Sequence, residues 1–89
     1  MTIHASHPEI IKRLKRAEGH LRSIVAMLED GRECLEIAQQ LQAVEKAIVN
    51  AKKSLVHDHI DHCLEHAVSP DPNQARTSVD EFKKITKYL

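Results

Sequence analysis

Two residues with metal-binding side chains, His59 and Cys63, lie four positions apart near the end of a long helical pattern. Positions i and i+4 of an α-helix are neighbours, with Cβ atoms about 5–6 Å apart. An imidazole and a thiol at that spacing can hold one soft metal ion. The other thiol, Cys34, lies so far before them that along one helix it would be roughly 37 Å from His59. If the three residues share one ion, Cys34 must come from a second copy of the chain.

More histidines lie near this pair and at the beginning of the chain. His62 adjoins Cys63, and His4 and His7 belong to the first residues. We expect metal binding because five candidate ligands crowd ten residues of one helix, although a single histidine is usually just a hydrogen-bonded side chain. They are His57, His59, His62, Cys63 and His66. The paired spacings of a zinc finger are missing. Because Cys34 has no histidine neighbour on its helix, the pattern does not favour nucleophilic catalysis, and we predict that the chain is not an enzyme.

The periodicity of apolar residues predicts an all-α fold that positions these side chains. Apolar residues recur every three or four positions over about 8–29, 32–66 and 74–89, after a flexible polar arm of residues 1–7. The middle helix is long and has no Gly or Pro, so it must pack against other helices along its length. Ser78-x-x-Glu81 is interpreted as a capping box that starts the last helix. We expect residues 1–89 to form a single metal-sensing and DNA-binding domain.

Composition indicates a small protein that completes its core by association. The chain has 89 residues with one Phe, one Tyr and no Trp, so its core must be aliphatic and small. No apolar run is long enough to span a membrane, so we expect no membrane partner. Two cysteines without a signal-peptide pattern favour a cytoplasmic protein, in which the thiols stay reduced.

Positive charges gather on the first helix although the formal net charge is zero. Such a stripe is compatible with contact to the phosphates of double-stranded DNA, and it is also typical of a solvated helix face. No helix-turn-helix spacing and no interleaved aromatic residues accompany it. The candidate DNA-binding residues are Arg13, Lys15, Arg16, Arg22, Lys52 and Lys53.

Four segments together resemble the CsoR/RcnR family of small metal- and electrophile-responsive repressors. They are Arg16-Ala17-Glu18-Gly19-His20-Leu21-Arg22, Glu33-Cys34-Leu35, Gln39-Gln40-Leu41-Gln42-Ala43-Val44 and His59-Ile60-Asp61-His62-Cys63. The resemblance implies three-helix protomers that form antiparallel dimers and then a helical-bundle tetramer, a dimer of dimers. It also implies operator DNA as the partner, released when the inducer binds. The implied ligand set is Cys34 from one protomer with His59 and Cys63 from the other.

The resemblance leaves several inducers open. Two thiolates and an imidazole suit Cu(I), whereas Ni(II) or Co(II) requires a further donor. His4, His7 or His62 can supply that donor, and Glu33 stands where copper sensors often carry Tyr. These features favour Ni(II) or Co(II) over Cu(I), and Zn(II) is a further alternative. A metal-buffering module or a thiol-based electrophile or persulfide sensor are the rival functions, and the basic stripe argues against a buffer that never binds DNA.

Overall fold

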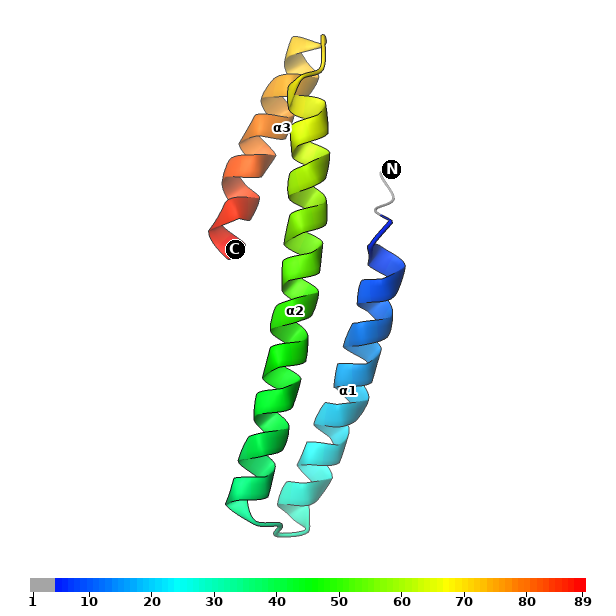
Figure 1. The fold of residues 1–89 in the computed structure, drawn as a ribbon, viewed down its shortest axis with the longest axis vertical. Coiled ribbons are helices and arrows are strands. Elements are labelled where there is room, and N and C mark those ends of the chain that lie inside the picture. The colour runs from blue at the N-terminus through cyan, green and yellow to red at the C-terminus, as the bar shows by residue number, and fades with distance from the viewer. Residues whose placement is uncertain (1–4) are drawn as a thin grey trace. The chain divides into compact units, whose positions relative to one another are not determined.

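The computed structural model describes residues 5–89, which form three α-helices and one short 3-10 helix (Figure 1). Helix α1 comprises His7–Glu29, α2 comprises Cys34–Ala67 and α3 comprises Pro72–Ile85, followed by η1, Thr86–Tyr88. The described residues include no strand. The expected all-α protomer with three helices and one long central helix is therefore confirmed.

Tertiary contacts divide the chain into two compact units. One contains residues 8–52, and the other contains residues 53–89 together with residues 5–7. Both units include part of α2. The pair His59 and Cys63 lies in the second unit, and most of the basic stripe lies in the first.

The first unit is a helical hairpin in which α1 and residues 34–52 run in opposite directions (Figure 1). Gly31 makes the turn possible with a φ of 69°, a conformation that glycine adopts without steric cost. The amide of Arg32 donates to the carbonyl of Met27 at 3.0 Å, and the amide of Gly31 donates to that of Leu28 at 3.2 Å. This pair of bonds is the Schellman arrangement, which satisfies the last carbonyls of α1.

Aliphatic side chains hold the hairpin together. Ile24, Ile37 and Val44 form a buried cluster against which Met27 packs. One polar contact joins the same helices, because His20 Nε2 lies 2.6 Å from the side-chain oxygen of Gln40. These contacts fix α1 against the first part of α2 and so determine which α1 side chains remain exposed.

In the second unit, α3 packs against the end of α2 and begins earlier than expected. Asp71 caps α3 by accepting a hydrogen bond from the amide of Asn73 at 3.0 Å, and Pro72 occupies the first turn. Pro is favoured there because its missing N–H needs no partner. The capping-box interpretation of Ser78-x-x-Glu81 is therefore wrong. Ser78 lies inside the helix and is only 8% exposed, which leaves Glu81 available for another role.

A row of large apolar side chains on α1 remains exposed in the single chain. Its members are Ile11, Leu14, Leu21, Val25 and Leu28. The sequence pattern places most of them on the apolar face of this helix, yet α2 does not cover them. Separately, none of the helices in the described part of the chain is long and apolar enough to cross a membrane.

Candidate metal centre

Three side chains of the second unit converge on one point: His59 and Cys63 of α2 and Glu81 of α3. Each offers a ligand atom, and these atoms lie within 4.8 Å of one another. His59 Nε2 is 3.5 Å from Glu81 Oε2, and the Cys63 thiol donates to the same oxygen over 4.0 Å. The predicted i, i+4 pair is thus brought together by α2, as expected. An imidazole, a thiol and a carboxylate at this spacing can hold a first-row transition metal ion.

The three ligand candidates differ in their exposure. Cys63 is only 1% exposed, His59 is half-buried and Glu81 is exposed. Burial raises the pKa of the Cys63 thiol, and the negative charge of Glu81 raises it further. Since the thiolate is the form that binds metal, an arriving ion must displace the proton from Cys63.

Sequence reasoning missed Glu81 as a member of this cluster. A signal was present, because Ser78, Glu81, Phe82 and Ile85 share one face of α3 at helical spacing. Glu81 itself stays exposed, but this face of α3 brings its carboxylate to His59 and Cys63.

A small hollow of about 230 Å³ opens beside the cluster. It is lined by His59 and Glu81 together with Lys84, Ile85 and Tyr88 from the end of the chain. Because the hollow adjoins His59 and Glu81, it leaves space for another donor group to approach the cluster.

Cys34 and His7, which were also predicted as ligands, do not belong to the cluster of His59, Cys63 and Glu81. Cys34 is the first residue of α2, is exposed, and belongs to the first unit. His7 is the first residue of α1 and is half-buried, whereas His4 lies outside the described residues. Ser6, just before His7, donates a hydrogen bond to the carboxylate of Asp58 at 2.5 Å. The described end of the arm therefore contacts α2 at Asp58, which is the residue before His59 in the sequence.

His62 does not join the cluster of His59, Cys63 and Glu81 but pairs with another histidine. Its ring centroid is 4.2 Å from that of His66, whereas it is 6.2 Å from that of His59. The structure thus places the half-buried His62 and His66 together one helical turn apart, beside the cluster.

All six candidate DNA-binding residues have exposed side chains. Arg13 and Arg16 line a hollow of about 310 Å³ in the first unit with Ala17, Ala47 and Asn50. Arg13 lies 3.7 Å from the carboxylate of Glu9. Two guanidinium groups and an amide around one hollow are suited to an anion such as a phosphate, and Asn50 was not among the predicted residues.

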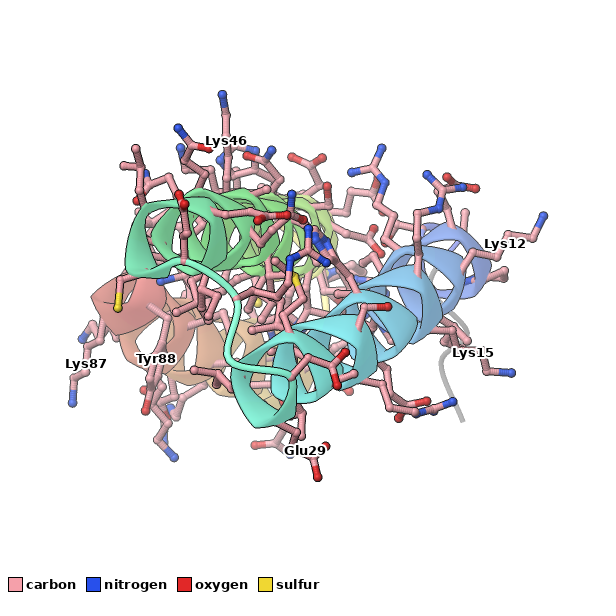
Figure 2. The ribbon with its side chains drawn as sticks, turned by 90° about the horizontal axis from the view of Figure 1, so that it is seen from below. Lys12, Lys15, Glu29, Lys46, Lys87 and Tyr88 are labelled. Carbon is pink, nitrogen blue, oxygen red and sulfur yellow. The ribbon has the colours of Figure 1, made fainter. Side chains whose placement is uncertain are left out.

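The other candidates are exposed at further positions of α1 and α2. Arg22 lies 3.7 Å from Glu18 one turn before it, and Lys15 extends away from the α1 ribbon, as does Lys12 (Figure 2). Lys52 and Lys53 are consecutive exposed residues of α2. Such exposed groups are compatible with phosphate contact, and ion pairs of this kind contribute little to stability.

Comparison with known proteins matches these features to one family. A family model described as metal-sensitive transcriptional repressor matches residues 6–88. The copper-sensing transcriptional repressor CsoR of Bacillus subtilis (strain 168) is 43% identical over 81 residues, which cover 89% of this chain and 80% of that protein. CsoR of Mycobacterium ulcerans (strain Agy99) is 35% identical over 78 residues, which cover 88% of this chain and 65% of that protein.

A solved structure shows the same fold. The nickel-responsive transcriptional regulator InrS superposes with a TM-score of 0.81 over 100% of this chain and 99% of that one, at 26% identity. Every one of these proteins is named as a transcriptional repressor or regulator, which confirms the expectation that the chain is not an enzyme. Because the family model spans nearly the whole chain, the protein belongs to the CsoR/RcnR family of metal-sensitive transcriptional repressors.

Proposed function

We propose that this metal-sensing repressor binds operator DNA in its metal-free form and releases the DNA when Ni(II) or Co(II) binds. The observation that carries the proposal is the convergence of His59, Cys63 and Glu81 within 4.8 Å. By thermodynamic linkage, DNA must weaken metal binding by the same factor by which the metal weakens DNA binding. The protein acts in the cytoplasm, where operator and metal ion both reach it.

Cys34 from a second copy of the chain supplies the remaining thiolate. Cys34 and Cys63 lie 29 positions apart in the same α-helix. Because each residue advances a helix by about 1.5 Å, the two thiols of one chain cannot bind the same ion. An exposed Cys34 and an open hollow beside His59 support a shared site. In an antiparallel dimer each Cys34 meets the His59 and Cys63 of its partner.

The exposed apolar row on α1 supports assembly into dimers and then into a homotetramer. Apolar side chains aligned on one helix face are unfavourable in water. Because these five are 41–59% exposed, covering each one contributes roughly half of the about 1.5–3 kcal/mol that burial of a fully exposed side chain gives. A second copy carries the same row, so symmetric association covers both.

The N-terminal arm favours Ni(II) or Co(II) as the inducer. These ions require more donors than two thiolates and one imidazole. The hydrogen bond from Ser6 to Asp58 attaches the described part of the arm to α2, one residue before His59 in the sequence, and His4 or His7 is the further donor in this proposal. Glu81 adds an oxygen donor, which a divalent ion accepts more readily than Cu(I) does.

Copper(I) is the second candidate, and a specific observation favours it. Both CsoR relatives are named as copper-sensing, and a site of two thiolates and one imidazole is complete for a three-coordinate Cu(I) ion. Zn(II) fits the same donors with a fourth ligand.

The basic hollow of α1 and α2 contacts DNA in this proposal. Arg13 and Arg16 bind backbone phosphate, and the exposed Lys15, Arg22, Lys52 and Lys53 add to the positive surface. Phosphate contacts position a protein on the duplex without reading its sequence.

The proposal is tested by titrating the anaerobic metal-free protein with Ni(II), Co(II), Cu(I) and Zn(II) while DNA release is followed by fluorescence anisotropy. We expect Ni(II) or Co(II) to release the DNA at one ion per Cys34 and to produce thiolate-to-metal absorption. Release by Cu(I) alone would transfer the role of inducer to copper. If no metal changes DNA affinity, the chain is not a metal-responsive repressor of this kind.

A further inference from the structure

We propose that His62 and His66 form a second metal site, separate from the cluster of His59, Cys63 and Glu81, which binds a divalent ion with two imidazoles and water. The pair lies one turn apart on α2, and the ring centroids are 4.2 Å apart with an interplanar angle of 42°. Imidazole nitrogen is a ligand that Zn(II) and Ni(II) share. The inference does not depend on DNA binding or on the identity of the inducer.

The ring of His66 is already held in the orientation that a metal ligand requires. Its Nδ1 lies 2.9 Å from the backbone carbonyl oxygen of His62. A carbonyl oxygen only accepts, so Nδ1 carries the hydrogen and donates it, and in the neutral ring Nε2 keeps its lone pair. Histidines that bind metals usually donate their other N–H to a carbonyl or carboxylate in this way, which fixes both tautomer and ring orientation.

The spacing and burial of the pair are also suitable. Side chains at i and i+4 project from the same face of a helix, and the rings of His62 and His66 lie there with a tilt of 42° and centroids 4.2 Å apart. Both residues are half-buried, so solvent reaches them and can supply the remaining ligands. In the described residues no third Cys, His, Asp or Glu completes this pair, so the ion keeps several waters.

The chemistry of the second site differs from that of the first. Without a thiolate it disfavours Cu(I), which prefers soft sulfur ligands, and it accepts borderline divalent ions. An ion at His62 and His66 therefore produces no thiolate-to-metal absorption. The site joins two turns at the end of α2, so its occupation stabilises the folded chain.

The test compares the full-length protein with His62→Gln and His66→Gln. The matched control is His57→Gln, which removes an exposed histidine from another face of the same helix. Each protein is titrated with Zn(II) and with Ni(II) alone against a chromophoric chelator, and the thiolate-to-nickel absorption is recorded. We expect wild type and His57→Gln to bind about one ion more per chain than either of the other variants, with the thiolate band unchanged in all four.

Nitrogen NMR of the histidine rings in the wild-type protein and the melting temperatures of the variants give two further readouts. We expect added Zn(II) to shift the Nε2 resonance of His66 while Nδ1 remains protonated, and to raise the melting temperature less in His66→Gln than in His57→Gln. Equal stoichiometry in His66→Gln and wild type would overturn the second site. So would a loss of the thiolate band in His66→Gln, because His66 would then belong to the first cluster. A failure of metal-induced DNA release leaves these outcomes unaffected.

Discussion

The thiol of Cys63 lies 4.0 Å from the carboxylate of Glu81, which another helix brings to it. Burial is the larger cause of the raised pKa of this thiol, and the charge of Glu81 adds to it. The arrangement keeps Cys63 protonated, and therefore less reactive toward oxidants, until a metal ion takes the place of its proton.

Glu81→Gln should lower the pKa of Cys63, because the substitution removes the negative charge and leaves the burial. The shift is measured by the ultraviolet absorbance of the thiolate during a pH titration in a Cys34→Ala background, where Cys63 is the one remaining cysteine. Asp80→Asn is the matched control, since it removes the neighbouring exposed carboxylate of the same helix. An unchanged or raised pKa in Glu81→Gln alone would show that its charge does not act on the thiol.

The raised pKa also predicts how stability varies with pH. The folded state holds the Cys63 proton more tightly than the unfolded state does, so the unfolded chain releases it first as pH rises. The contribution of Cys63 to the free energy of unfolding should therefore be fully present below the ordinary thiol pKa of 9.0. It should be lost as the pH rises above that value. Denaturant unfolding of Cys34→Ala at several pH values measures this loss. The double variant that also carries Cys63→Ala should not show it, and an identical pH dependence in both would refute the assignment.

A shared site predicts complementation between two inactive variants. Cys34→Ala and Cys63→Ala should each lose metal-induced DNA release, since both thiolates serve one ion. When the two proteins are unfolded together and refolded, mixed dimers contain one intact site and one lacking both thiols. Metal binding should then return in part, in proportion to the mixed dimers. The same proteins mixed without unfolding provide the control. Should the refolded mixture remain inactive, each chain would have to build its site alone.

The arm predicts different behaviour of nickel and copper. His4→Ala or His7→Ala should weaken Ni(II) or Co(II) binding. Loss of a residue that only orients a ligand lowers metal affinity about 10–100-fold, so loss of a ligand itself should lower it more. Cu(I) binding should change little, because its three donors lie elsewhere. Competition with chelators of known affinity measures both, and His57→Ala controls for the loss of a histidine. If nickel affinity survives both substitutions, the arm contributes no ligand and copper becomes the leading inducer.

The basic hollow predicts a salt-dependent contact with DNA. Arg13→Ala or Arg16→Ala should weaken operator binding and should reduce the slope of log affinity against log salt concentration by about one. Arg76→Ala on α3 is the matched control, because it removes an exposed arginine outside the hollow. Anisotropy titrations at several salt concentrations give the slopes. Unaltered binding in the Arg13→Ala/Arg16→Ala double variant would make the stripe a solvated helix face.

Local sequence was sufficient to predict most helices and the proximity of His59 and Cys63 in the candidate site. Helical periodicity, Gly31 and the absence of Gly and Pro from the long helix act over a few residues, so spacing alone indicates α1 and α2. For the same reason, the four-residue interval between His59 and Cys63 places their side chains together whatever the rest of the chain does. The pairing of His62 with His66 follows the same rule, although it was not predicted.

Contacts between residues far apart in sequence were decided by tertiary structure. Glu81 reaches Cys63 because α3 packs against α2. Helical spacing relates residues of one helix only, so it cannot pair residues of two different helices. The interpretation of Ser78 and Glu81 as a cap failed because Asp71 and Pro72 offered an earlier and stronger start for α3. Asn50 joined Arg13 and Arg16 only through the packing of two helices. Local periodicity specifies which face of a helix is apolar, but the free energy of packing specifies which other helix covers it.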